Sequence, residues 1–225
     1  MSDIISLCIG VFVVALFKGI ISRYYRKINR YFCLLIILFP MLCLSVLYWN
    51  NSLIVFYDIN VMLVLTSIVC IFLILIVDLK NIAIALRLNF KIRDRAEVSS
   101  IIFSISSLIF FSIIEEIYIR VFVQQTIAQR FPMLSIMIST IIFILHHMIY
   151  PVIKYRVKQL LMLTVMSLLN GILFHLTQNL IYPVLCHLIF NLPGIANEIG
   201  LLIKNMSRQF KYQSGCPDDE RGGTL

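Results

Sequence analysis

The chain has 225 residues, of which 60% are hydrophobic and only 13% are charged, and its formal net charge is +8. A soluble domain carries about 25% charged residues, so this composition excludes an ordinary soluble enzyme. Several apolar runs reach the roughly 20 residues that a helix needs to cross a bilayer. The sequence therefore predicts an all-α fold, a polytopic transmembrane helical bundle with about seven spans.

The predicted spans, in chain order, are the apolar runs 4–21, 32–49, 61–77, 99–127, 133–150, 159–176 and 180–203. Of the 19 lysines and arginines, 16 fall in 22–31, 78–98, 151–158 and the segment after 203. Cytoplasmic loops carry such an excess of cations, so the positive charge reflects topology rather than nucleic-acid binding. We expect a multi-pass protein of the cell membrane with a cytoplasmic C-terminus.

Three regions follow from this pattern. Residues 1–98 hold three spans and a cytoplasmic amphipathic linker, residues 99–203 hold the predicted catalytic core in spans four to seven, and residues 204–225 form a polar cytoplasmic tail that we expect to be disordered. The first span contains one cation, Lys18, near its end. We expect the Lys18 side chain to snorkel, with its ammonium at the membrane interface.

The fourth span contains the charged stretch Ser-Ile-Ile-Glu-Glu-Ile-Tyr-Ile-Arg at 112–120. Each charge at the centre of a membrane helix costs about 2.5–3.5 kcal/mol, so three charges without a use are hard to explain. Glu116 and Arg120 are four residues apart and can pair on one helix face. Glu115 lies roughly 100° further round, where it would be left as a general base for water.

All histidines of the chain fall in or beside the last three spans: His146, His147, His175 and His187. The helical rise of about 1.5 Å per residue puts Glu115, His147 and His187 at overlapping depths, and Asn191 follows one turn after His187 on the same face. Because ionisable residues inside a membrane usually serve function, we predict a site of these four residues. The two other histidines we interpret as packing residues that donate hydrogen bonds between helices.

Three motifs occur in order, each on its own span, within residues 99–193. They read Glu115-Glu116-x-x-x-Arg120, Phe143-x-x-x-His147 and His187-x-x-x-Asn191. This pattern resembles the CPBP family, the CAAX-protease and bacteriocin-processing enzymes that are also called Abi or type II CAAX prenyl endopeptidases. One such motif is a weak signal, whereas three with this order and spacing are much more specific. The sequence departs from the family at Val121, where a glycine is usual after the arginine.

The resemblance implies an intramembrane endopeptidase. Glu115 would match the base that activates water with the help of His147, and His187 with Asn191 would match the groups that stabilise the oxyanion. Glu116 and Arg120 would support them.

The residues of the predicted site are compatible with either a zinc site or a metal-free site. Glu115, His147 and His187 would make a plausible zinc set with an open position. We favour a metal-free, glutamate-dependent site without a cofactor, because His187 and Asn191 then both have roles and no H-E-x-x-H motif is present.

The predicted function is hydrolysis of a peptide bond in a membrane-associated, lipidated or precursor peptide, and the resemblance suggests peptide maturation or bacteriocin self-immunity. The expected partners are the lipid bilayer and a peptide or prenylated-peptide substrate, with no nucleic acid. Two alternatives stay open: a non-catalytic bacteriocin immunity protein on the same scaffold, and a proton-coupled transporter. The intact set of acidic, histidine and asparagine residues favours the enzyme, and the lack of a visible inverted repeat disfavours the transporter.

Overall fold

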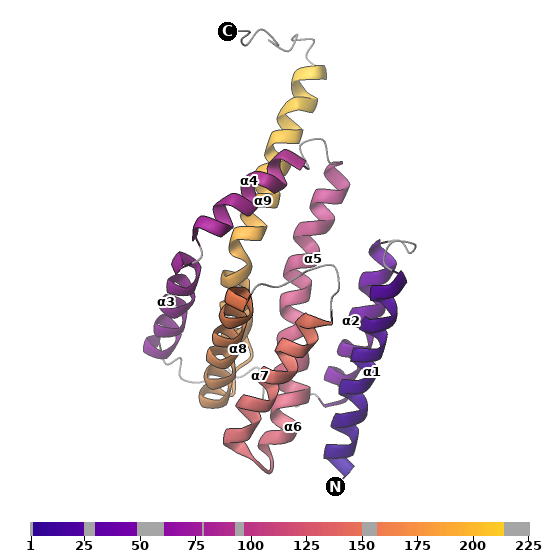
Figure 1. Cartoon of the computed structure of the whole chain (residues 1–225), viewed down its shortest axis with the longest axis vertical. Coiled ribbons are helices and arrows are strands. Elements are labelled where there is room, and N and C mark those ends of the chain that lie inside the picture. Colours follow the sequence, from indigo (N-terminus) through magenta and orange to yellow (C-terminus); the bar gives the residue numbers. More distant parts are fainter. Residues whose placement is uncertain are drawn as a thin grey trace. The chain divides into compact units, whose positions relative to one another are not determined.

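The structure is a computed structural model that describes residues 2–24, 30–48, 61–77, 79–92, 97–149 and 157–213. These residues form helices and no strand, which confirms the predicted all-α polytopic bundle. The elements are α1 (Ser2–Tyr24), α2 (Arg30–Leu47), α3 (Val61–Val77), α4 (Leu79–Ile92), α5 (Val98–Glu116), the π-helix η2 (Ile117–Gln124), α6 (Gln125–Ala128), α7 (Pro132–Met148), α8 (Val157–Thr177) and α9 (Ile181–Gln213) (Figure 1).

Each predicted span corresponds to one helix or one continuous run of helices. Among the described residues, the segments long and apolar enough to cross a membrane are Ile4–Ile21, Val98–Ala128, Val157–Thr177 and Ile181–Arg208. The pair Val61–Val77 and Ile82–Leu88, bent by 68°, would count as one more. Ile36–Leu47 and Pro132–Met148 are apolar but shorter. The number of seven crossings therefore stays a prediction.

The helices divide into two compact units. The first contains Met1–Ile76 and Phe110–Phe190, and the second contains Val77–Ile109 and Asn191–Leu225. These units are defined by contacts between helices, and the division into regions 1–98, 99–203 and 204–225 stays a prediction.

The expectation of a disordered tail changes in part, because α9 continues to Gln213 and residues 204–213 are therefore helical. Residues 214–225 of the predicted tail lie outside the described part of the chain.

In the first unit, η2 packs against α2, α7 and α8. Helix α1 lies beside α2 (Figure 1) and also contacts α6. Aliphatic and aromatic side chains from these helices form the core, among them Val14, Ile37, Met41, Tyr118, Phe122, Phe143 and Met166. A Cβ added at Gly10 of α1 would stand 2.5 Å from the Phe122 ring, so the glycine allows α1 to approach η2 closely. The core thus fixes η2 from several sides.

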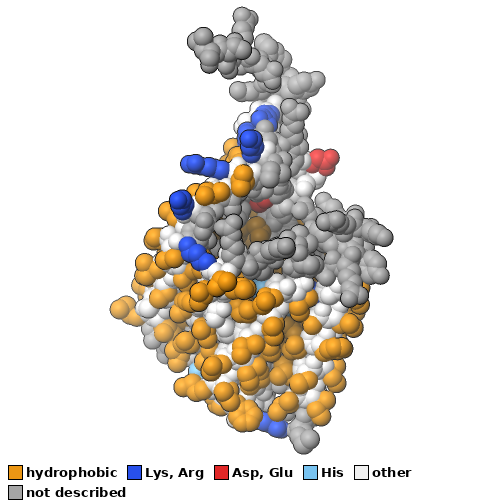
Figure 2. Space-filling model, in the orientation of Figure 1, with side chains coloured by type: hydrophobic (Ala, Val, Ile, Leu, Met, Phe, Trp, Pro, Cys, Tyr) orange, Lys and Arg blue, Asp and Glu red, His pale blue; other side chains and the backbone are white. Residues whose placement is uncertain are grey.

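Large hydrophobic side chains are also exposed, and Figure 2 shows them over most of the described surface in view. Among them are Phe12, Phe39, Phe72, Ile141 and Leu161. Soluble monomers rarely expose apolar patches of this kind, whereas the lipid-facing surface of a membrane bundle requires them.

In the second unit, α4 packs against the later part of α9. The ring of Phe90 lies 2.9 Å from the position that a Cβ at Gly200 would take, and Lys204 Nζ lies 5.8 Å from the centre of that ring. The latter is a cation–π distance. The predicted amphipathic linker thus contains a helix, with exposed Lys80, Arg87 and Lys91 along it.

Candidate active site

The charged stretch of the predicted fourth span ends α5 and begins η2. The α-helix ends at Glu116 and the π-helical turns start at the next residue. At its far end the Gln125 N–H donates to the Arg120 carbonyl five residues earlier, which is the π-helical pattern. Such wide turns occur often at functional sites. Nothing in the residue types of this segment predicted it.

Glu116 and Arg120 form the predicted ion pair. Arg120 Nε donates to Glu116 Oε2 over 2.9 Å, and both side chains are fully buried. This geometry confirms the pairing that the four-residue spacing indicated.

The remaining guanidinium donors of Arg120 hold neighbouring helices. Nη1 donates to Gln124 Oε1 over 2.9 Å and to Ser139 Oγ on α7 over 3.4 Å. Nη2 donates to the Ser167 carbonyl on α8 over 3.1 Å. Gln124 Nε2 in turn donates to the Gly171 carbonyl over 2.8 Å. A buried guanidinium with its donors satisfied in this way fixes η2 between α7 and α8.

The second oxygen of Glu116 connects α8 and α9. Asn170 Nδ2 donates to Glu116 Oε1 over 2.8 Å, and His187 Nδ1 lies 3.0 Å from the same oxygen. Because a carboxylate oxygen accepts, the His187 Nδ1 carries the hydrogen. Asn170 Nδ2 also donates to the Pro183 carbonyl near the start of α9 over 3.1 Å. Glu116 therefore orients the predicted site residue His187.

Glu115 faces a different set of groups. Its Oε1 lies 3.4 Å from His146 Nδ1, and its Oε2 lies 3.7 Å from His147 Nε2. Glu115 is buried, as is His146, while His147 is partly buried. The structure thus brings together Glu115 and His147, as the sequence predicted, and adds His146, which we had interpreted as a packing residue.

The hydrogen-bond partner of His147 determines its tautomer. Its Nδ1 lies 2.9 Å from the Phe143 carbonyl one turn earlier on α7. A carbonyl only accepts, so Nδ1 carries the hydrogen, and in the neutral ring Nε2 is an acceptor, which lies 3.7 Å from Glu115 Oε2. The 3.7 Å separation is longer than a direct hydrogen bond, and it is short enough for one water molecule beside the pair to donate a hydrogen to each atom.

Lys18 reaches this cluster from α1. Its Nζ donates to His146 Nδ1 and to the His146 carbonyl, both over 2.8 Å, and its charge interacts with Glu115. The side chain is 3% exposed. The expectation that Lys18 snorkels is therefore wrong, because the stem of the side chain lies on the buried face of α1 and leads inward.

Within the described part of the chain, the donor atoms that meet the distance requirement for a metal ion belong to Glu115, His146 and His147, and they lie within 4.8 Å of one another. The zinc set considered from the sequence contained His187 instead of His146, but His187 Nδ1 is hydrogen bonded to Glu116. The ammonium of Lys18 donates to His146 Nδ1 and interacts electrostatically with Glu115, so a divalent cation here would meet like-charge repulsion. The donor set fits a metal in type and spacing, but not with Lys18 in this position.

The fourth predicted site residue, Asn191, lies on α9 one helical turn after His187. It belongs to the second compact unit, whereas the other three belong to the first. Its role in the site stays a prediction.

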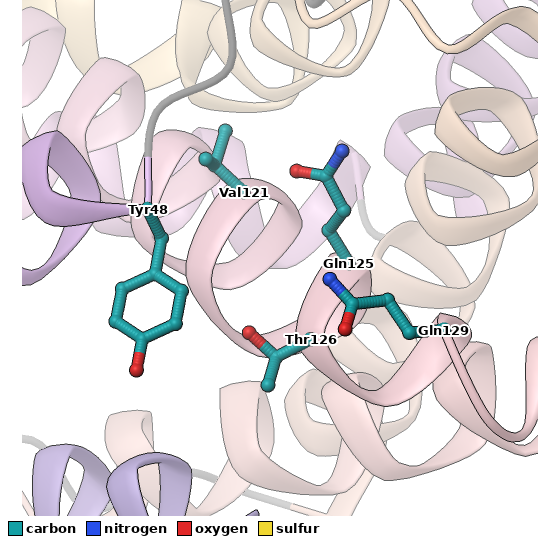
Figure 3. Close-up of a pocket in the computed structure, with 5 residues that line it drawn as sticks. All are labelled: Tyr48, Val121, Gln125, Thr126 and Gln129. Atoms are coloured by element: carbon teal, nitrogen blue, oxygen red, sulfur yellow. The ribbon is translucent and has the colours of Figure 1, made fainter. Parts of the chain in front are cut away.

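A small pocket lies apart from the charged cluster, on the next turns of the same helical run (Figure 3). It is lined by Tyr48, Val121, Gln125, Thr126 and Gln129. Val121, the position where the CPBP pattern usually has glycine, thus borders a partly polar pocket beside α2. None of the predicted site residues lines it.

Several site residues were not found from the sequence. His146 was recognisable only as the neighbour of His147, and Asn170 carried no signal. Lys18 could have been found, because it continues the spacing of the buried residues Leu7, Val14 and Ile21 along α1.

The fold and the site together define a multi-pass helical membrane protein with a buried carboxylate–histidine centre. Residues 97–193 match the family model described as Type II CAAX prenyl endopeptidase Rce1-like. The matched region contains all three motifs, so the comparison confirms the resemblance for this part of the chain. The family supports a CAAX-type intramembrane endopeptidase, a peptide hydrolase, as the class of activity.

The match leaves α1, α2, α3, α4 and the part of α9 after residue 193 outside it. None of the curated proteins and none of the solved structures compared with the chain matches it.

Proposed function

We propose that this protein is an intramembrane endopeptidase in which Glu115 and His147 activate a water molecule without a metal ion. The observation that carries the proposal is the pairing of two acceptor atoms in the helix bundle, Glu115 Oε2 and His147 Nε2, which lie 3.7 Å apart. Both atoms accept hydrogen bonds, so a water beside the pair donates one hydrogen to each and directs its lone pairs away from them. A water held in that way is oriented to attack a carbonyl carbon.

The proposed reaction needs one proton relay. Glu115 takes a proton from the water as the oxygen bonds to the scissile carbonyl carbon, which forms a tetrahedral oxyanion. The Glu115 carboxylic acid then gives the proton to the amide nitrogen, and the carbon–nitrogen bond breaks. Glu115 returns to the carboxylate, with one water consumed and two peptide ends formed.

His187 and Asn191 are the proposed oxyanion donors. His187 Nδ1–H is held by Glu116 at 3.0 Å, so only the imidazolium form has a second hydrogen, on Nε2, to offer. Arg120 and Asn170 keep the Glu116 carboxylate in place. Asn191 would add a neutral donor from the next turn of α9. Removing one such donor typically costs about 10²- to 10³-fold in rate.

The proposed substrate is a membrane-associated peptide, either lipidated or a precursor, in the cell membrane, with the C-terminus of the enzyme on the cytoplasmic side. The family match supports a CAAX-type substrate class. A role in peptide maturation or bacteriocin self-immunity rests on the family resemblance.

Cleavage by purified protein tests the proposal. The protein is reconstituted in lipid vesicles with a set of prenylated and unmodified precursor peptides, and products are identified by mass spectrometry. We expect Glu115→Gln to lose about 10²- to 10⁴-fold in turnover because the amide cannot take the proton. Glu198→Gln is a matched control, since Glu198 is another buried carboxylate but lies outside the cluster. Equal turnover by Glu115→Gln and the unmodified protein would contradict the mechanism.

A further inference from the structure

The N-terminal helix α1 lies outside the matched family region, yet it contributes a charge to the site. Its buried face contains Leu7, Val14 and Ile21, and Lys18 occupies the same face at 3% exposure. A lysine in an apolar stripe is costly unless it has partners, since a charge inside a membrane helix costs about 2.5–3.5 kcal/mol. The position of Lys18 therefore calls for an explanation beyond packing.

Lys18 has two described partners on one residue of α7. Its Nζ donates to the His146 carbonyl and to the His146 Nδ1, each over 2.8 Å. The carbonyl belongs to the last turn of α7, where carbonyls have no partner within the helix and a cation interacts favourably with the helix dipole. One ammonium thus caps α7 and orients a ring at the same time.

The hydrogen bond from Lys18 to the imidazole ring also determines which ring nitrogen of His146 is an acceptor. Because an ammonium only donates, His146 Nδ1 is an acceptor and does not carry a hydrogen. His146 Nδ1 and Glu115 Oε1, which lie 3.4 Å apart, are then two acceptors that would repel each other without a cation between or beside them. Lys18 interacts electrostatically with Glu115 and supplies that cation.

The geometry points to Lys18 as a positioning residue of the active site, which holds the end of α7 and balances the charge of Glu115 in place of a metal ion. This inference rests on the proposed function. Lys18 does not touch the water or the peptide. It keeps His147, the next residue after its partner, at the distance from Glu115 that the water requires. The N-terminal helix α1 is then part of the enzyme's active centre and not an accessory anchor.

Kinetics test the positioning role. Lys18→Met keeps an apolar stem of similar length and removes the ammonium, so we expect kcat per folded molecule to fall about 10- to 100-fold, as misplacement of catalytic groups by about 1 Å does. We expect KM to change little, because the peptide does not contact Lys18. Lys18→Arg keeps the charge and should recover part of kcat. Val14→Ala, on the same buried face, is the packing control and should leave kcat of the folded fraction unchanged.

Thermal stability tests the charge coupling independently of proteolysis. Lys18→Met and Glu115→Gln are made singly and together, and Tm is measured for each in the same detergent. If Lys18 balances Glu115, Lys18→Met lowers Tm in the unmodified protein and lowers it much less when Glu115 is already glutamine. Equal Tm shifts in both backgrounds would show that the two residues are not coupled and would overturn the inference.

The two measurements also separate this inference from the proposed function. A protein without any proteolytic activity, but with coupled Tm shifts, would refute the protease assignment and retain Lys18 as the partner of Glu115. An active protein in which Lys18→Met keeps full kcat would refute the positioning role alone. If Lys18→Met yields no folded protein, the comparison of Lys18→Arg with Val14→Ala decides, since only a charge requirement predicts folded and active Lys18→Arg.

Discussion

Glu116 Oε1 accepts hydrogen bonds from Asn170 and His187, two residues that lie 54 and 71 positions away along the chain. The same carboxylate accepts from Arg120 through its other oxygen, so it joins η2, α8 and α9 at one fully buried point. Glu115, the adjacent residue, faces His146 and His147. Two neighbouring glutamates thus serve separate purposes: one holds the helices together, and the other faces the proposed reaction.

Replacing Arg120 with alanine is expected to reduce the amount of folded protein as well as its activity. The substitution leaves Glu116 as a buried charge without its guanidinium partner, and breaking a buried pair costs about 3–5 kcal/mol. The measurement is the yield of monodisperse protein and its Tm in detergent.

Arg130→Ala is the control for Arg120→Ala, because Arg130 is exposed near the end of the same helical run. An exposed change of this kind usually shifts stability by less than about 0.5 kcal/mol. Arg120→Ala with normal yield and turnover would show that neither folding nor activity requires the hydrogen bonds of the Arg120 guanidinium.

Asn170→Asp is expected to destabilise the protein more than Asn170→Ala. Alanine removes the donor to Glu116 and to the Pro183 carbonyl, and each unsatisfied buried acceptor costs about 1–3 kcal/mol. Aspartate adds a second negative charge beside Glu116 where a donor is required. Thermal unfolding of both variants checks the order, and an Asn170→Asp variant as stable as Asn170→Ala would contradict the expected repulsion between the carboxyl groups at positions 116 and 170.

Asn191→Ala is expected to lower kcat by about 10²- to 10³-fold with little change in KM. The reason is that an oxyanion donor acts on charge that develops only in the transition state. The check is a full rate profile against peptide concentration for the variant in vesicles. Asn197→Ala on the same helix is the control, because Asn197 is a buried asparagine outside the predicted site. A rise in KM with unchanged kcat would instead assign Asn191 to substrate binding.

Exhaustive treatment with a chelator is expected to leave turnover unchanged, and elemental analysis of active protein should find less than stoichiometric zinc. The Lys18 ammonium beside His146 and Glu115 disfavours a divalent ion at the cluster of Glu115, His146 and His147. One tightly held zinc per chain, with activity lost on its removal and restored on its return, would contradict the metal-free mechanism and leave the protease assignment in place.

The helices and the Glu116–Arg120 pair were predictable because they depend on residues close together in the chain. Apolar runs of sufficient length form helices in a bilayer, since backbone groups there have no water to bind. A spacing of four residues puts Glu116 and Arg120 on one face of an α-helix, and the pair also forms here, where π-helical turns begin directly after Glu116. The three motifs likewise needed only their order and spacing to indicate the family.

The partners of those motifs were decided by the tertiary structure. Lys18 meets His146 across 128 residues, and Asn170 meets Glu116 across 54. No local pattern encodes such distances, because they result from which helix faces pack together in the core. His146 and His147 differ by one residue, or roughly 100° around the helix, and only the packing of α1, α5 and α7 determines that both turn toward Glu115. A membrane helix bundle buries its polar groups at the contacts between its helices, and only the tertiary structure determines which helix faces form those contacts.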